Sequence, residues 1–429
     1  MAFVTTIDPA LTGPDQIVLQ NLYQDLHRRT SVRGQDQDSK ARNPVPNKEV
    51  TQPRSPGVCS PSKARDDTDV TSLKSFNEPS SPAFEPTVFT IWNATDLNPV
   101  LDAYVIRPYS RLAQTALRHP TDVVFLTHII LYLSTIVPSA IYLLAPGNFI
   151  WSHGVLHTVF TMWCAGPFTL LLHNHIHNNG IFRKDVWWAR WADWGFPYVL
   201  EPLMGHTWDS YFYHHVKHHH VEGNGPNDLS STLRYQRDAP LDFAHYFFRF
   251  FLLVWYDLPM YFVRTNKHSL AIRAFLSEII SYTFFATMTY YNAKAATFVF
   301  LLPFVLLRFG LMVGNWGQHA LVDESNRHSF NDGYHTAHHL NPLRHWRDQP
   351  SHFLAQKSAY SNGRALVFHD MDYIMLTIRL LSKDYTYIAR RFVPINEEQA
   401  RMNVAEVEQM LKTKTRKFSE QEIRGKFKL

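Results

Sequence analysis

Four long apolar stretches constrain this chain more than any other feature of its sequence. Each supplies the ~20 consecutive residues that an α-helix needs to cross a hydrocarbon layer about 30 Å thick. They cover Asp122–Ala145, Phe149–Leu172, Ala271–Tyr291 and Ala295–Val313. The sequence therefore predicts an all-α integral membrane protein, multi-pass, with four transmembrane helices.

The charges outside these stretches predict its orientation. The segment between the second and third stretches is rich in Lys and Arg, whereas the connectors Pro146–Asn148 and Asn292–Lys294 are short and nearly uncharged. By the positive-inside rule, that segment and both termini face the cytosol, at the endoplasmic reticulum if the source is eukaryotic. The net charge of +5 suits a chain that faces anionic lipid, and we expect no nucleic acid as partner.

The remaining regions differ from this core in composition. Residues 1–86 are polar and rich in Ser and Pro, and we expect them to be mostly disordered, apart from a short amphipathic helix over Asp15–Arg29. Residues 87–121 regain aromatic side chains and predict a membrane-proximal segment. Residues 122–350 form the core domain, and residues 351–429 a cytosolic helical region and tail.

Two charged residues lie inside the apolar stretches. Glu278 belongs to the third stretch and Arg308 to the fourth. An unpaired charge is costly inside a membrane, so an ion pair between them is one prediction. The alternative is that Arg308 extends to the membrane surface.

Histidine is the residue type that points to chemistry. The chain has 24 histidines and only two cysteines, which exclude a disulfide framework and a Cys-based zinc or iron–sulfur site. The histidines gather in groups at the predicted cytosolic helix ends: His173 and His177; His214, His215, His218, His219 and His220; His319, with Asn315; and His335, His338 and His339. Within these groups the spacing i, i+4 places side chains on one helix face, and His175 points elsewhere.

The predicted topology brings all these groups to the same side of the membrane. Nine or more imidazoles exceed what one zinc ion needs and suffice for two first-row metal ions, among which iron, copper, zinc and nickel all accept imidazole. We expect a cytosolic helical domain to cap the transmembrane helices and hold this poly-histidine site. His153 and His157 lie toward the opposite face of the membrane, and we assign them, together with His128 of the first stretch, to helix packing or polar contacts.

The spacing of these groups resembles the histidine boxes of the membrane-bound non-heme di-iron superfamily of fatty acid desaturases, acyl hydroxylases and alkane hydroxylases. The phrase Gly333–Pro342 is similar to the third box of the acyl desaturases, and Asn315 with His319 to their N-x3-H element. The resemblance covers roughly residues 120–350. It implies that Asn315 holds an iron-bound water and that the catalytic and metal-binding residues are His173, His177, His215, His219, His220, His319, His335, His338 and His339, with His218 a further candidate ligand.

This resemblance also implies an activity. It predicts an oxidoreductase in which two iron ions and O2 introduce a double bond into the acyl chain of a membrane lipid or acyl-CoA. No His-Pro-Gly-Gly haem motif is present, so we expect a separate electron donor, of the cytochrome b5 or ferredoxin type. Hydroxylation of a fatty acid or alkane is the alternative within the superfamily. A membrane metal-binding or metal-transport protein is the alternative from another class.

The five histidines between residues 214 and 220 permit more than one ligand register. His215-x2-His218-His219 fits the desaturase spacing, whereas His215-x3-His219-His220 and His214-x3-His218-His219 fit that of alkane hydroxylases. In alkane hydroxylases a Pro-x-Asp-x-x-Ser element follows the box, and Pro226, Asp228 and Ser231 match it at the same distance from His220. We therefore prefer His215, His219 and His220. His219 is common to all three registers.

Overall fold

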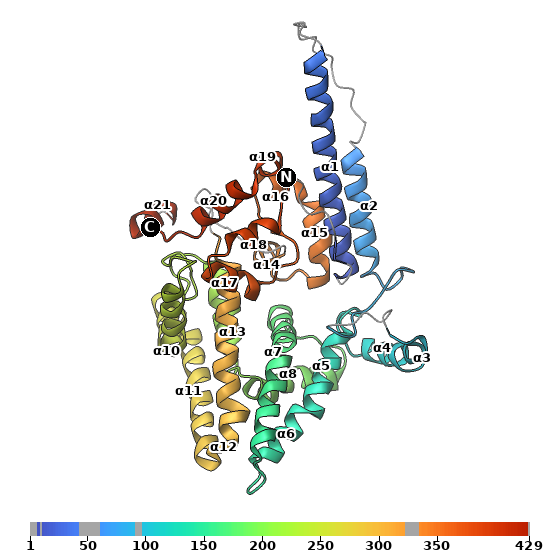
Figure 1. Ribbon diagram of the computed structural model, residues 1–429. Coiled ribbons are helices and arrows are strands. Elements are labelled where there is room, and N and C mark those ends of the chain that lie inside the picture. The colour runs from blue at the N-terminus through green and yellow to red at the C-terminus, as the bar shows by residue number, and fades with distance from the viewer. Residues whose placement is uncertain (1–6, 9–10, 43–60, 91–96, 322–333, 428–429) are drawn as a thin grey trace. The chain divides into compact units, whose positions relative to one another are not determined.

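The computed structural model describes residues 7–8, 11–42, 61–90, 97–321 and 334–427. These residues are mostly helical (Figure 1), and they include one short antiparallel sheet. They divide into two compact units. The first unit holds residues 1–83 and 321–415, and the second unit holds residues 84–320 and 416–429.

The second unit contains the long apolar helices. Its elements are α3 (Pro99–Leu101), η2 (Asp102–Ile106), α4 (Arg107–Gln114), α5 (Val123–Ser134), α6 (Ile136–Leu144), α7 (Trp151–Asn178), α8 (Trp187–Leu203), η3 (Phe212–His219), α9 (His220–Glu222), α10 (Pro240–Arg264), α11 (His268–Tyr291), α12 (Ala293–Ala296), η4 (Thr297–Leu301), α13 (Leu302–Gln318) and α21 (Glu420–Phe427).

Four helical stretches of this unit are long and apolar enough to cross a membrane. They are Val123–Leu144, Trp151–Asn178, His268–Tyr291 and Ala293–Gln318. The four predicted spans are thereby confirmed as helices, and their ends shift by a few residues. The largest shift is in α7, which continues past Leu172 to Asn178, so that the first histidine pair lies on the long helix itself.

Glu278 of α11 and Arg308 of α13 form the predicted ion pair. Arg308 Nη2 lies 2.8 Å from both carboxylate oxygens of Glu278, and Thr207 Oγ1 accepts a further hydrogen bond from it at 3.0 Å. Arg308 is 7 % exposed, which excludes the alternative of an arginine that extends to the surface. The pair connects α11 and α13 within the apolar region of the second unit.

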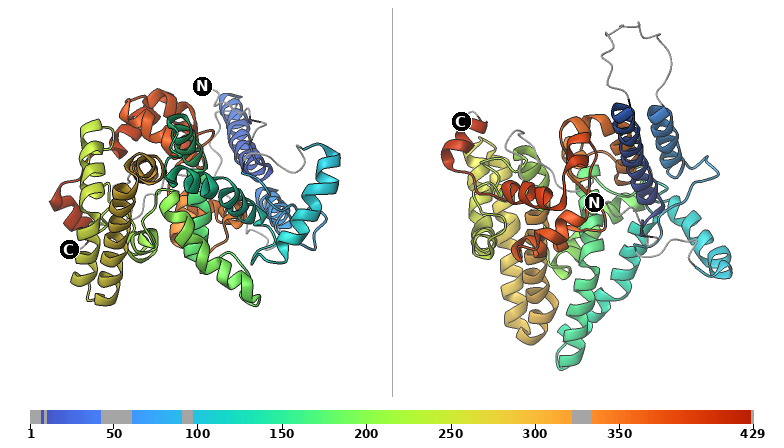
Figure 2. Two further views of the ribbon diagram at one scale, coloured as in Figure 1. Left: turned by 90° about the horizontal axis from the view of Figure 1, so that it is seen from below. Right: turned by 45° about the horizontal axis from the view of Figure 1, so that its top comes forward.

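α10 is a single helix that runs beside α11 (Figure 2). The sequence of Phe243–Phe262 predicts an interfacial or re-entrant segment rather than a span, because Arg249, Asp257 and Pro259 interrupt it. The helix is unbroken, but it is not among the four stretches that are long and apolar enough to cross a membrane. The two charges pair instead, with Arg249 Nη2 at 3.1 Å from Asp257 Oδ2, and Pro259 lies inside the helix. Val254, Leu258 and other apolar residues pack this helix against α11.

The first unit combines residues 1–83 with residues 321–415. Its elements are α1 (Gly13–Arg42), α2 (Pro61–Ser75), α14 (His335–Leu340), η5 (Trp346–Asp348), α15 (Gln349–Ala355), α16 (Lys357–Asn362), β1 (Val367–Phe368), α17 (Tyr373–Leu381), α18 (Tyr385–Arg390), β2 (Phe392–Val393), α19 (Glu397–Arg401) and α20 (Val404–Lys414). β1 and β2 pair antiparallel, Val367 with Val393 and Phe368 with Phe392.

The structure corrects our expectation for residues 1–86. The predicted helix near residue 15 is present, but it extends through Arg42, and α2 is a second helix where we expected disorder. The boundary at residue 351 also differs, because residues 321–415 group with residues 1–83. Residues 43–60 of the predicted disordered region lie outside the described residues.

Charged contacts explain why α2 forms despite its few apolar residues. Lys357 Nζ lies 2.7 Å from Asp25 Oδ2 of α1 and 2.6 Å from Asp66 Oδ1 of α2, and Arg65 of α2 also pairs with Asp25. Burial raises the pKa of the Asp25 carboxyl, but hydrogen bonds from Lys357 and Arg65 outweigh it and lower the pKa. The pairing of distant charges fixes this helix, together with Val70 and Leu73, which pack in the core of the unit.

Candidate metal centre

The last turn of α7 carries the first histidine pair. The rings of His173 and His177 are 4.6 Å apart between centroids, as expected for residues spaced i, i+4 on one helix face. Asn179 ends the helix in the left-handed conformation, with φ 53°, and Gly180 follows with φ 104°. A Cβ atom on Gly180 would lie 1.6 Å from Asp193 Oδ2, so this turn requires glycine.

Asp193 of α8 anchors this end of α7. Its Oδ1 accepts the N–H of Ile181 at 2.9 Å, and its Oδ2 accepts Lys184 Nζ at 2.6 Å. His175 Nδ1 lies 3.3 Å from Oδ1 of the same carboxylate. The prediction that His175 points away from the first pair is therefore confirmed. The sequence did not reveal that Asp193 contacts this turn, since Asp193 follows His175 by 18 positions and belongs to another helix.

Four of the five histidines of the second group lie on the π-helix η3, and His220 is the first residue of α9. An α-helical reading of the sequence does not anticipate the π-helix. In a π-helix the backbone bonds connect residues five apart. The N–H of His220 donates to the carbonyl of His215 in this way. As a result the rings of His215 and His220 stand together, 4.6 Å apart between centroids, although an α-helix would separate them.

Three ring nitrogens from these two groups converge. His215 Nε2 lies 2.9 Å from His173 Nε2 and 3.1 Å from His220 Nε2. An imidazole nitrogen has either one hydrogen or one lone pair, so His215 Nε2 cannot make a good hydrogen bond to both. Two nitrogens bound at right angles to one metal ion, each about 2.1 Å from it, would lie about 3.0 Å apart. The spacing thus suits three lone pairs directed at a cation.

His177 joins this convergence. A ring nitrogen of each of the four residues His173, His177, His215 and His220 lies within 4.8 Å of the others. Burial, and then the neighbouring imidazoles, hold the pKa of His215 well below its usual value. A low pKa favours the neutral imidazole, which is the form that binds metals. We call these four residues the four-histidine cluster.

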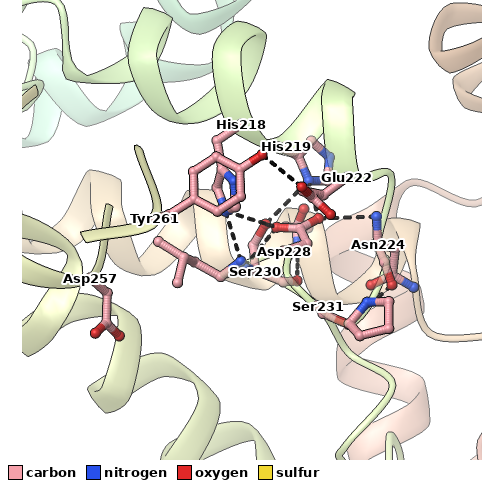
Figure 3. A network of polar contacts seen from close by, with 12 residues as sticks. His218, His219, Glu222, Asn224, Asp228, Ser230, Ser231, Asp257 and Tyr261 are labelled. Atoms are coloured by element: carbon pink, nitrogen blue, oxygen red, sulfur yellow. Dashed lines mark hydrogen bonds and ion pairs between the residues drawn. The ribbon is translucent and has the colours of Figure 1, made fainter. Parts of the chain in front are cut away.

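His219 and His319 form a second, smaller group in the same unit. Their ring centroids are 5.1 Å apart, and each offers a nitrogen within 4.8 Å of the other. Burial and the nearby His219 lower the pKa of His319 to about 3. On its other side, His219 Nδ1 lies 2.7 Å from Asp228 Oδ2 (Figure 3). Although burial raises the pKa of the Asp228 carboxyl, His219 and its neighbours lower it more, to well below its usual range.

His214 and His218 are turned away from the four-histidine cluster. His218 Nε2 accepts the N–H of Leu229 at 2.9 Å, and its ring packs on Tyr261 at 4.2 Å between centroids. The His214 ring packs edge-on against Phe250. Among the five histidines, His215, His219 and His220 therefore have the neighbours expected of ligands, and this is the register that we preferred.

The end of α13 is fixed to the loop that follows the second histidine group. Thr232 Oγ1 donates to the carbonyl of His319 at 2.6 Å, and the buried Arg237 donates to the carbonyl of Ala320 at 2.8 Å. Asn315 Nδ2 donates to the carbonyl of Ser230 at 2.9 Å and to Tyr246 Oη at 2.6 Å. Both amide hydrogens of Asn315 thus go to protein acceptors, and only its carbonyl oxygen is left to face a bound water.

The third predicted group belongs to the first unit. His335 and His339 share a face of α14, with ring centroids 4.5 Å apart, and the centroid of His338 is 6.4 Å from that of His335. The i, i+4 spacing therefore brings the rings of His335 and His339 together on α14, as predicted. Their role as ligands stays a prediction. Gly333, the first residue of the phrase that is similar to the third box, lies outside the described residues.

The histidines that we assigned to packing or polar contacts have such contacts. Ser139 Oγ lies 2.8 Å from His153 Nε2 and 2.9 Å from His157 Nδ1, so one hydroxyl joins both rings to α6. His128 Nδ1 lies 2.6 Å from Tyr132 Oη. None of the three belongs to a cluster of metal-ligating side chains among the residues that the structure describes.

Comparison with known proteins does not place the chain in a family. No protein-family model matches it, and neither a curated protein nor a solved structure does.

Proposed function

We propose that this chain is a membrane-embedded, iron-dependent oxidoreductase that uses O2 to desaturate the acyl chain of a lipid or acyl-CoA. The observation that carries the proposal is the convergence of His173, His215 and His220, whose Nε2 atoms stand at the spacing of adjacent metal ligands. The resemblance to the histidine-box enzymes supplies the identity of the metal and the class of reaction.

Exposed apolar side chains support a location in the membrane. Four helices are long and apolar enough to cross it, and their outer faces expose many large apolar residues. On α8 the side chains of Trp187, Trp191 and Trp194 are exposed, and such residues are typical of the membrane–water interface. We retain the proposed topology, in which the histidine-bearing helix ends and both termini face the cytosol.

The described residues would hold one iron ion with the four-histidine cluster and would contribute His219 and His319 to a second. Bound iron would supply the redox chemistry by which O2 attacks an unactivated C–H bond. The chain's own part is to keep the imidazoles neutral by burial, to fix the ends of α7 and α13, and to limit the access of water. By resemblance we assign His335, His338 and His339 as further ligands. Electrons would come from a separate carrier.

Hydroxylation is the second candidate, and two observations favour it. Asp228 and Ser231, which match the element of alkane hydroxylases, are buried beside the second histidine group. The amide hydrogens of Asn315, the residue that resembles the water-holding element of desaturases, are used on Ser230 and Tyr246. These contacts leave the choice between an alkene and an alcohol product to experiment.

A lipid profile tests the activity directly. The chain is expressed in a host of defined lipid composition, and the fatty acids are analysed for new alkenes and new alcohols. We expect a new product, its loss in His177→Asn and in His219→Ala, and its retention in His153→Gln, because His153 Nε2 lies 2.8 Å from Ser139 Oγ of α6 and belongs to neither group of the described residues that could hold a metal ion. A host profile that the iron-loaded wild-type chain leaves unchanged, with an electron donor present, would contradict the proposal.

A further inference from the structure

The loop after the second histidine group is built around one carboxylate. Asp228 is fully buried, and each of its oxygens accepts hydrogen bonds from the loop itself: Oδ2 from the N–H of Asn224 at 3.0 Å, and Oδ1 from the N–H and hydroxyl of Ser230 at 2.9 and 2.8 Å. Figure 3 shows these contacts around His219. The carboxylate is therefore held in one orientation before any ligand binds.

This orientation determines which nitrogen of His219 is protonated. An ionised carboxylate only accepts hydrogen bonds, so the Nδ1 atom that faces Asp228 Oδ2 at 2.7 Å must carry the hydrogen. Nε2 then has the lone pair. A metal-bound histidine usually donates its other N–H to a carboxylate or carbonyl, which fixes the tautomer and the direction of the ring.

The same loop has the opposite effect on the neighbouring residue. The N–H of Leu229, next to Asp228, donates to His218 Nε2, so that lone pair is already used. The loop also supports the other histidine of the small group, since Thr232 Oγ1 holds the carbonyl of His319. One segment thus orients His219, supports the backbone at His319, and occupies the Nε2 lone pair of His218.

We propose that Asp228 is a positioning residue that makes His219 a metal ligand, and that the Leu229 N–H keeps His218 from becoming one. This inference rests on the proposed metal centre and goes further, because it states how a run of five histidines is sorted into ligands and neighbours. The sorting lies in the loop rather than in the spacing of the run.

Metal titration of the purified full-length chain tests the assignment. Ferrous iron is added without oxygen against a competing chelator, and Co2+ is added in parallel because its visible spectrum reports the nitrogen ligands. We expect Asp228→Asn to weaken one of the two metal equivalents by 10–100-fold and to change the Co2+ spectrum, since an amide directs an N–H at His219 or at its own hydrogen-bond donors. Ser230→Ala removes one hydroxyl and gives a smaller loss of the same kind.

His218→Gln is the matched control. Glutamine still offers an acceptor to the Leu229 N–H, and we expect both metal equivalents to bind with wild-type affinity. Elution volume and far-ultraviolet circular dichroism show that each variant is folded, and Ser230→Ala replaces Asp228→Asn if the latter does not fold. Wild-type affinity in both Asp228→Asn and Ser230→Ala overturns the proposal, as does a loss in His218→Gln equal to that in Asp228→Asn. A wild-type chain that binds neither metal instead refutes the proposed function.

Discussion

Arg308 and Glu278 are two single residues whose ion pair connects α11 with α13, the helix whose C-cap is His319. Both are buried, and Arg308 also lies 4.5 Å from the centre of the Phe304 ring. Their pairing followed from the sequence because each lies inside an apolar stretch, where an unpaired charge is costly. What the sequence did not reveal is Thr207, which bonds to both partners from the segment after α8.

Removal of one member of this pair should destabilise the second unit strongly. Arg308→Met leaves the Glu278 carboxylate buried without its cation, at a cost of about 3–5 kcal/mol. Thermal unfolding in detergent measures the loss. The double variant Arg308→Met with Glu278→Gln should recover most of it, because no buried charge is then left alone. A double variant less stable than Arg308→Met would show that the pair is not the source of the effect.

The histidines show how far a one-dimensional pattern determines a site. The pairs at i, i+4, His173 with His177 and His335 with His339, were predicted from spacing and are found together. The approach of His215 to His220 was not foreseen, because it depends on a π-helical turn that shifts the register by one residue. The turning-away of His218 depends on a backbone N–H, which no side-chain pattern encodes.

At the scale of elements, α2 shows a helix held by charges. The sequence of Pro61–Ser75 has few apolar residues, so hydrophobic periodicity could not identify it. Its partners, Asp25 and Lys357, are separated from it by long stretches of chain, and only the folded unit brings them together. Disorder was therefore the natural expectation from local composition alone.

Lys357 is the centre of this interaction, since its Nζ contacts Asn21, Asp25 and Asp66 at 2.6–2.7 Å. Lys357→Met should destabilise the first unit by about 2–4 kcal/mol, because two carboxylates then lose their shared cation in a half-buried site. Proteolysis of α1 and α2 under native conditions measures the loosening. Lys383→Met, at an exposed position of the same unit, is the control and should leave the digestion pattern unchanged. Equal digestion in both variants would contradict the assignment.

The predicted membrane-proximal segment, residues 87–121, contains the helix formed by α3, η2 and α4. Ile106, Ser110 and Ala113 face the unit and are buried, whereas Val100, Tyr104 and Leu112 are 65 %, 79 % and 71 % exposed. A helix with a second, exposed apolar face is suited to lie in the membrane interface. Residues 91–96 of the predicted segment lie outside the described residues.

Spin labels test this placement. With Cys59 replaced by serine, and with Cys164 buried from the label, nitroxides are attached at Val100→Cys, Leu112→Cys and, as the water-facing control, Glu420→Cys in lipid vesicles. The two labels on the helix should collide more with oxygen, which dissolves in lipid, than with a water-soluble nickel chelate, and the control label should do the reverse. Preference for the nickel chelate at both helix positions would place this helix in water.

At the scale of the whole molecule, the sequence predicted what local patterns encode and missed what distant contacts decide. Length and hydropathy were enough for four apolar helices, because each is a continuous stretch of chain. The division into units was missed, because the first unit combines residues 1–83 with residues 321–415. The loop around Asp228 was predicted in part: its residue types were recognised from the sequence, but the contact of Asp228 with His219 was not.

The central claim of this account is that the clustered histidines bind iron, and the metal content of the purified chain tests it most directly. The protein is purified from cells supplied with iron, zinc and copper, and each metal is measured per chain by elemental analysis. The double variant His173→Asn with His177→Asn is purified and measured in the same way. We predict about two iron ions per wild-type chain and about half as much iron in the double variant, because two imidazoles of the four-histidine cluster are lost. Zinc or copper without iron in the wild-type chain, or iron that the double variant retains in full, would contradict the claim.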